Sequence, residues 1–206
     1  MKEQIQSIVS QLYDSFRRKD IVREELIRYN RELTRASGLA IQNFVSNNPE
    51  KAKEYLENAL SYLTKIRNII EQYREFEGWG GISSGIEEYC EAKILEAIIK
   101  EKNIPTPEEL GVAEELYILG MADVPGELKR ILLIKLMDDD LEYSRHLVEL
   151  IRTFYTSLVG IDFSKGQISS LRKKIDRVRY VMEQAERDLA TSYVSIKLRK
   201  AIEKQD

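Results

Sequence analysis

The chain has 206 residues, of which 43% are hydrophobic, 33% charged and 8% aromatic, with only 10 Gly and 4 Pro. Because residues that break helices are scarce, this composition predicts a soluble all-α protein with one domain over residues 1–206. The net charge of −3 excludes a strong overall attraction to polyanions, and the single Cys and single His exclude an intramolecular disulfide and a classical zinc site. No run of residues resembles a signal peptide or a membrane span, which predicts a cytoplasmic protein without a membrane partner.

The first half of the chain predicts three helices. Apolar residues recur at helical spacing from Ile5 to Ile41, which predicts one long helix, or two end to end, stopped by Asn47-Asn48-Pro49. A second apolar face over residues 52–70 ends in the glycine-rich stretch 78–85, where the chain must turn. A third helix begins at residue 86 and stops before Pro105.

The second half begins at Thr106, which can cap a helix and is followed by a Pro suited to a first turn. Residues 113–137 are expected to form one strongly apolar helix that kinks at Pro125. The acidic residues 138–140 suit the positive end of a further helix, and a last helix is expected to begin near Lys165. The simplest architecture is an antiparallel bundle of six or seven long helices, and the surplus of apolar faces predicts burial against another subunit.

Most catalytic signatures are absent from the sequence. The stretch 78–85 follows a helix and lacks the Lys-Ser/Thr of a phosphate-binding loop. Residues 138–140 begin like a calcium loop, but Tyr143 stands where that loop needs Gly. His146 has no Glu three residues before it, as a di-iron bundle requires, and Cys90 lies on an apolar stretch as a small hydrophobic residue.

Two pairs of acidic residues are the strongest chemical signal. Glu88 and Glu91 are three residues apart and Asp123 and Glu127 are four apart, so each pair projects from one face of its helix among mostly apolar neighbours. Buried carboxylates must be protonated, paired with a cation or bound to a metal. Oxygen ligands alone select a hard divalent ion such as Mg²⁺ or Mn²⁺, which could promote hydrolysis of a phosphodiester without a histidine.

A second interpretation of these pairs needs no metal. In a chain that is one-third charged, acidic pairs at this spacing often solvate a helix face or form ion pairs, here with Lys93, Lys129 or Arg130. Spacing alone favours this structural interpretation, because periodicity does not show that the two helices face each other.

Four segments of the chain resemble the translin and Trax family. Tyr117-Ile-Leu-Gly-Met-Ala-Asp-Val-Pro-Gly-Glu-Leu-Lys-Arg130 resembles the signature helix of that family, and in particular the Gly-x-Ala-Asp-x-x-Gly-Glu-Leu-x-Arg pattern of its Trax branch. Glu87-Glu-Tyr-Cys-Glu-Ala92 is similar to the Trax segment that carries two catalytic glutamates. Thr106-Pro-Glu-Glu-Leu-Gly111 resembles the turn before the signature helix, and Ser170-Leu-Arg-Lys-Lys-Ile-Asp-Arg-Val-Arg-Tyr180 resembles the last long helix of the family.

The resemblance implies an all-helical fold, a hollow oligomer taken to be an octamer, binding of single-stranded nucleic acid, and metal-dependent RNA cleavage of the Trax type. It implies that Glu88, Glu91 and Asp123 are catalytic residues that hold Mg²⁺ or Mn²⁺, with Glu127 as a further ligand. Translin lacks the upstream glutamates, so the chain is Trax-like at this site. A homo-oligomer, as in archaeal-type single-subunit members, is the simplest expectation.

Two basic clusters are candidates for contact with RNA. They consist of Arg172, Lys173, Lys174 and Arg177 on the last predicted helix and of Arg17 and Arg18 near the start of the chain. Acidic residues are interleaved with each cluster, so a solvated helix face or an intersubunit salt bridge is an equal alternative. Trp79 is expected at an oligomer interface rather than stacked on a base.

These observations lead to hypotheses from different classes. The first is a Mg²⁺- or Mn²⁺-dependent endoribonuclease that cleaves single-stranded RNA with water as the nucleophile. The alternative is a non-catalytic oligomeric protein that binds single-stranded RNA, or single-stranded DNA, in a salt-sensitive way. A third is a helical scaffold without affinity for nucleic acid.

Overall fold

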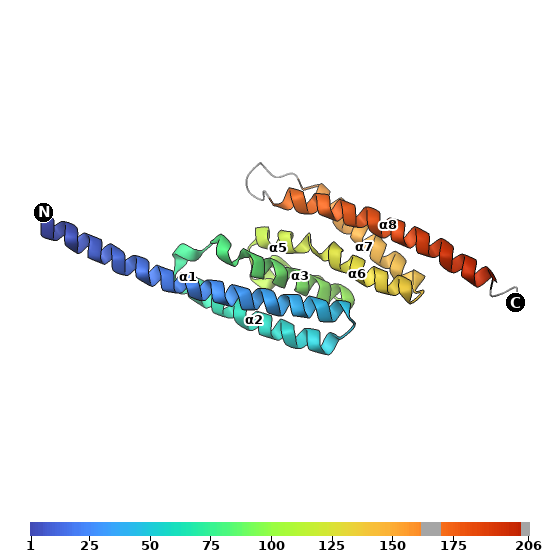
Figure 1. The fold of residues 1–206 in the computed structure, drawn as a ribbon, viewed down its shortest axis with the longest axis horizontal. Helices are drawn as coiled ribbons and strands as arrows, with labels where there is room; N and C mark the ends of the chain where they lie inside the picture. Colours follow the sequence, from blue (N-terminus) through green and yellow to red (C-terminus); the bar gives the residue numbers. More distant parts are fainter. Residues whose placement is uncertain (162–169, 203–206) are drawn as a thin grey trace.

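The computed structural model describes residues 1–161 and 170–202, and every regular element within them is a helix (Figure 1). The longer helices are α1 (Lys2–Val45), α2 (Pro49–Gln72), α3 (Ser83–Ile99), α5 (Glu114–Met121), α6 (Val124–Met137), α7 (Leu141–Val159) and α8 (Leu171–Ile202). A single turn, α4 (Pro107–Leu110), and the 3₁₀ turns η1 (Arg74–Phe76) and η2 (Gly80–Ile82) lie between them. The predicted all-α class is confirmed, while the expected helix start near Lys165 lies outside the described residues.

The helices pack side by side in the order that Figure 1 shows, with α1 and α2 on one side, α3, α5 and α6 in the middle, and α7 and α8 on the other side. Short connections make α1 antiparallel to α2, and α6 antiparallel to α7. The core between them is filled by fully buried aliphatic side chains, among them Leu26, Leu33, Ile66, Ile94, Leu128, Leu132, Leu147 and Ile151. None of the described helices is both long enough and apolar enough to cross a membrane.

The N-terminal part of α1 extends beyond this bundle (Figure 1). Residues 1–21 are exposed, apart from the partly buried Ser15, and Val22 is the first buried residue of the helix. Only the second half of α1 therefore contributes to the core.

Several helix starts follow from the local sequence. Pro49 opens α2, where its missing N–H leaves no intrahelical hydrogen bond unmade. The Thr106 hydroxyl accepts a hydrogen bond from the Glu109 amide at 3.2 Å, and the Glu109 carboxylate accepts one from the Thr106 amide at 2.8 Å. Asp140 caps α7 by accepting from the Tyr143 amide at 3.1 Å, which confirms that the acidic residues 138–140 start a helix.

The expectation of one kinked helix over residues 113–137 is wrong, because the chain breaks into α5 and α6 around Asp123. The Asp123 amide donates to the Gly120 carbonyl at 3.1 Å, and the Asp123 carbonyl accepts from the Gly126 amide at 3.0 Å. Pro125 lies in the first turn of α6, a position that tolerates Pro better than a helix interior does. Asp123 is therefore the point at which the chain changes direction. The third helix also starts earlier than expected, at Ser83.

Candidate functional site

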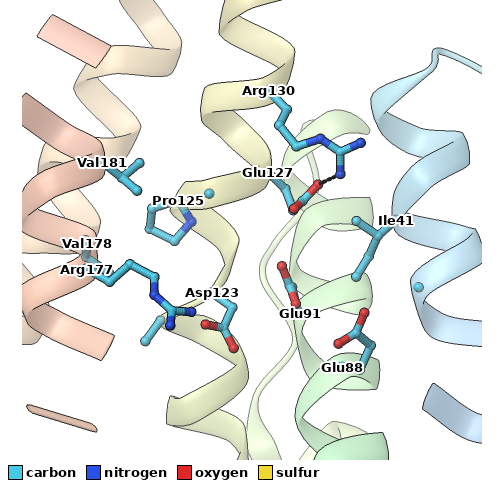
Figure 2. A pocket seen from close by; sticks show the side chains of 13 residues that line it. Ile41, Glu88, Glu91, Asp123, Pro125, Glu127, Arg130, Arg177, Val178 and Val181 are labelled. Carbon is cyan, nitrogen blue, oxygen red and sulfur yellow. Dashed lines mark hydrogen bonds and ion pairs between the residues drawn. The ribbon is translucent and has the colours of Figure 1, made fainter. Parts of the chain in front are cut away.

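One pocket brings the four predicted carboxylates together. Glu88 and Glu91 reach it from α3, Asp123 from the break between α5 and α6, and Glu127 from the first turn of α6. Figure 2 shows Asp123 across the pocket from the two glutamates of α3, and Glu127 beside Glu91. The pocket has a volume of about 420 Å³, and residues of α1 and α8 complete its wall. The two acidic pairs therefore face each other across the pocket, which spacing alone did not show.

A side chain of α1 holds the start of α3. Asn30 Oδ1 accepts a hydrogen bond from the Gly85 amide at 3.0 Å, and Asn30 Nδ2 donates to Ser84 Oγ at 3.0 Å. Asn30 thus satisfies a first-turn backbone donor of α3, as an N-cap side chain does, although it belongs to another helix. A Cβ at Gly85 would collide with the Asn30 oxygen. This clamp fixes the helix turn that carries Glu88.

Gly120 lets α5 approach α3 at the pocket. A Cβ at this position would collide with the Glu87 carbonyl and would lie 2.8 Å from the Cβ of Cys90. The two backbones therefore approach as closely as only Gly permits. Asp123 follows three residues later, so this contact brings its carboxylate to the α3 glutamates. A Gly inside a helical pattern can signal a close approach of two backbones, and sequence reasoning missed this signal at Gly120.

Burial and crowding make both α3 glutamates weak acids. Glu91 is only 7% exposed, and burial, together with the charges of Glu88, Asp123 and Glu127, raises its pKa to about 9. Burial, and then the charges of Asp123 and Glu127, also raise the pKa of Glu88. Within the described residues no hydrogen bond or ion pair reaches either carboxylate. Without a bound cation, Glu91 therefore carries a proton at neutral pH.

Asp123 is paired with a lysine of α8. Lys174 Nζ donates to Asp123 Oδ2 at 2.5 Å, to Glu87 Oε2 at 2.8 Å and to the Leu119 carbonyl at 3.1 Å. Burial of Lys174 favours its neutral form, but these hydrogen bonds outweigh burial and raise the pKa of Lys174, so its ammonium stays charged. Sequence reasoning missed Glu87 and this pairing, because a contact over 51 residues leaves no local pattern.

Glu127 is also paired, with Arg130, whose Nη1 donates to Glu127 Oε2 at 2.7 Å (Figure 2). This is one of the ion pairs that the structural interpretation of the acidic residues named.

The two lysines named by that interpretation pair elsewhere. Lys93 contacts Glu96 at 2.5 Å, and Lys129 contacts Asp188 at 3.5 Å. Neither of these lysines neutralises a carboxylate that lines the pocket.

The chemistry of these donors fits a hard divalent cation, since all four pocket acids offer oxygen. Their present arrangement does not enclose a single point, because over residues 1–161 and 170–202 no three acidic, His or Cys side chains are placed to hold one ion. Two of the four donors are engaged by cations, Asp123 by Lys174 and Glu127 by Arg130. Each cation contacts one oxygen, Oδ2 of Asp123 and Oε2 of Glu127, so a metal centre here would have to share these carboxylates with their partners or displace the partners.

The predicted RNA-contacting residues occupy three different surroundings. Arg177 lines the acidic pocket from α8, and Lys174 lies in the ion pairs just described. Arg172 and Lys173 are exposed in the first turn of α8. Arg17 and Arg18 are exposed on the projecting part of α1 and do not line the pocket.

Trp79 packs within the chain, edge-on to Phe76 with ring centroids 5.7 Å apart and beneath Arg23 at 5.7 Å. The expected interface role of Trp79 stays a prediction.

The fold and the pocket define a class of protein: an all-helical chain in which acidic residues of α3, of the break between α5 and α6 and of α6 line a pocket that a basic last helix completes. The chain belongs to the Translin family, whose model matches residues 21–194. It is 32% identical over 188 residues to the uncharacterised protein MJ0175 of Methanocaldococcus jannaschii, with 90% of this chain and 83% of that protein covered.

Solved structures of C3PO proteins share the fold. AfC3PO is 26% identical with a TM-score of 0.79, and AfC3PO in complex with duplex RNA is 25% identical with a TM-score of 0.78, each over 91% of this chain and 97% of that chain. Apo-NeC3PO has a TM-score of 0.80 over 89% of this chain and 96% of that chain, and at 23% identity it shows the fold alone. The resemblance stated from the four sequence segments is thereby confirmed at the level of family and fold.

Proposed function

We propose that this protein is a Mg²⁺- or Mn²⁺-dependent endoribonuclease that cleaves single-stranded RNA by attack of water on the phosphodiester. The observation that carries the proposal is the convergence of Glu88, Glu91, Asp123 and Glu127 on one pocket that Arg177 also lines. An ionised carboxylate buried without a counter-charge is costly to maintain, and the raised pKa of Glu91 reflects this cost. A site that binds a cation gives them a function.

In the proposed mechanism, Glu88, Glu91 and Asp123 would hold the metal ion, and Glu127 would complete or orient this set. The ion, when bound, supplies positive charge for the phosphate oxygens and makes a water molecule acidic enough to act as nucleophile. Glu91 would serve as a ligand only in its deprotonated form, with its proton passing to bulk water. Arg177, at the edge of the pocket, binds the phosphate by a charge-assisted hydrogen bond and orients the scissile bond.

RNA as the substrate is supported from two directions. AfC3PO, which shares the fold over most of its length, has been solved in a complex with duplex RNA. In this chain the exposed Arg172 and Lys173 lie within two turns of Arg177, so a phosphate backbone could run from the start of α8 to the pocket. Because the AfC3PO complex contains duplex RNA, the preference for single strands needs a direct comparison.

A homo-oligomer is part of the proposal and is supported by the projecting part of α1. Ile5, Ile8, Leu12 and Phe16 are 49–63% exposed and recur at helical spacing, so they form an apolar stripe in contact with water. A stripe of this kind on a soluble chain marks a surface for another protein. The subunit count of eight and the cytoplasmic location stay predictions from the sequence.

A non-catalytic binder of nucleic acid is the second candidate, and one observation favours it. Asp123 and Glu127 are already neutralised by Lys174 and Arg130, so the acidic residues are partly satisfied without a metal. This candidate predicts salt-sensitive binding and no turnover with any divalent ion.

Cleavage by a Glu91→Gln variant tests the proposal, since this change removes charge at nearly constant shape. Labelled single-stranded and duplex RNA are incubated with each protein in Mg²⁺, Mn²⁺ or EDTA, and product is followed with time. We expect the wild type to cleave single-stranded RNA only with metal and the variant to lose at least about 100-fold in rate.

Glu96→Gln is the matched control, because Glu96 lies on the same helix but pairs with Lys93 and Lys100 and does not line the pocket. It should cleave at the wild-type rate. Binding without cleavage by all three proteins would establish the non-catalytic binder instead.

A further inference from the structure

Lys174 is a fully coordinated ammonium inside the wall of the candidate site. Its side chain is 17% exposed, and its three contacts to Asp123, Glu87 and the Leu119 carbonyl lie between 2.5 and 3.1 Å. An ammonium has three N–H donors, so Lys174 has none left for another partner. Its positive charge therefore stands beside Asp123, a carboxylate of the pocket, where a bound metal ion would also place positive charge.

The charge of Lys174 acts on the whole acidic cluster. It is the cation whose charge lowers the pKa of both Glu88 and Glu91, against their burial and their mutual repulsion. A divalent cation in the pocket would stand close to this ammonium, and like charges at such distances repel strongly where water is excluded. Lys174 and a metal ion therefore compete for Asp123, the carboxylate of the pocket that Lys174 contacts.

We propose that Lys174 is an internal counter-cation that weakens metal binding, because a divalent ion bound to Asp123 must either share this carboxylate with the neighbouring ammonium, which holds Oδ2, or displace it. Lys174 is in this sense a positioning residue, because it acts through Asp123 and raises the metal concentration that the site needs to bind an ion. The inference rests on the proposed metal site, and it explains why four carboxylates share a pocket in which no three enclose one point within the described residues.

A purely structural role for Lys174 makes the opposite prediction. If the lysine only ties α8 to α3 and α5, then its removal loosens the pocket wall, and the affinity for metal stays the same or falls. If the lysine competes with metal, removal of its charge frees Asp123 and makes the affinity rise. The affinity for a divalent ion in the absence of RNA therefore separates the two roles.

The test measures Mn²⁺ binding to the full chain by electron paramagnetic resonance of free Mn²⁺, without RNA, for wild type, Lys174→Met and Lys174→Arg. We expect Lys174→Met to bind Mn²⁺ at least about tenfold more tightly than wild type. Lys174→Arg keeps the charge and should stay within about twofold of wild type. Lys174→Gln removes the charge but keeps a donor for Asp123, and it replaces the Met variant should that variant not fold.

Lys129→Met is the matched control. Lys129 joins α6 to α8 through Asp188, and its side-chain exposure of 23% is close to the 17% of Lys174, but its partner Asp188 does not line the pocket, whereas Asp123 does. Its removal should leave the Mn²⁺ affinity unchanged.

Two outcomes overturn the inference in distinguishable ways. Equal or weaker Mn²⁺ binding by a folded Lys174→Met, with binding by wild type intact, contradicts the role of Lys174 alone. No Mn²⁺ binding by either protein at millimolar concentrations contradicts the metal site and the inference together.

Discussion

At the scale of the residue, Glu91 is the most perturbed acid of the pocket. It combines near-complete burial with three neighbouring carboxylates, and its pKa is about 9. A carboxyl group that is neutral at pH 7 can remain in such surroundings, whereas an ionised one needs a cation. Glu91 is thus a protonated, neutral carboxyl group in the metal-free protein and an anionic ligand in the proposed metal-bound protein.

Glu91 should therefore make the metal-free protein less stable as the pH rises. The folded state holds the Glu91 proton more tightly than the unfolded chain, so its stabilising effect is complete below about pH 4.5 and is lost as the pH rises through about 9. We expect the free energy of unfolding of wild type, relative to Glu91→Gln, to fall steadily from pH 5 to pH 9. Denaturant unfolding in EDTA at pH 5, 7 and 9 measures it, and parallel pH profiles for the two proteins would contradict it.

Divalent metal should reverse this trend. Because protons and metal compete for Glu91, addition of Mn²⁺ should raise the melting temperature of wild type more at pH 8 than at pH 6. Glu91→Gln serves as the reference, and its melting temperature should respond to Mn²⁺ weakly at both pH values. An equal response of both proteins at both pH values would assign the Mn²⁺ effect to a site elsewhere.

The sequence could predict the four acids but not their partners. Glu88 with Glu91, and Asp123 with Glu127, are visible as pairs because helical spacing is local and because each pair lies in a segment that resembles a known family. The partner of Asp123 was not visible, since Lys174 stands in a run of basic residues that reads equally well as an RNA contact. Lys173 and Lys174 are equivalent in the sequence, and which of them turns inward depends on how α8 packs against the rest of the chain.

At the scale of the element, the close crossing of α3 and α5 determines where the second acidic pair lies. The apolar pattern of residues 113–137 predicted one helix, because hydrophobic periodicity continues through the break at Asp123. The break depends instead on backbone contacts, with Gly120 against Glu87 on one side and Pro125 in the next first turn on the other. Patterns of hydrophobic residues do not report such contacts.

Gly120→Ala should accordingly destabilise the protein, because the added methyl group meets the Glu87 backbone and cannot be accommodated by a side-chain rotation. We expect a loss of about 1–3 kcal/mol in the free energy of unfolding. Gly126→Ala is the matched control, since a Cβ there meets no atom within 4 Å, and it should be neutral or stabilising by at most about 1 kcal/mol. Equal effects of the two changes would show that α5 can shift away from α3 at little cost.

At the scale of the whole molecule, the projecting part of α1 leaves apolar residues without a partner in the chain. The sequence predicted that some helical surface would be buried against another subunit, and the exposed stripe from Ile5 to Phe16 is where the structure leaves such a surface. The geometry of an oligomer cannot be derived from periodicity, because the spacing of apolar residues identifies a face and not its partner.

Ile8→Lys combined with Leu12→Lys should reduce the molecular mass in solution, measured by size-exclusion chromatography with light scattering. Both side chains are about half exposed in the single chain, so the fold should keep its melting behaviour while the contact between subunits is lost. Ser7→Lys with Ser10→Lys adds the same charge on the face of the helix opposite the apolar stripe and should leave the mass unchanged. A mass unaffected by either pair would assign assembly to another surface.

The wall of the acidic pocket contains residues from both the first and the last long helix, Ile41 of α1 and Arg177 of α8. During synthesis the N-terminal helices can fold while the rest of the chain is still being made. The acids of α3 and α6 are then present, but the cavity stays open on the side that α8 later covers. A ribosome-bound or prematurely terminated chain therefore has the acidic residues without the completed pocket, and the site comes into being only with the last helix.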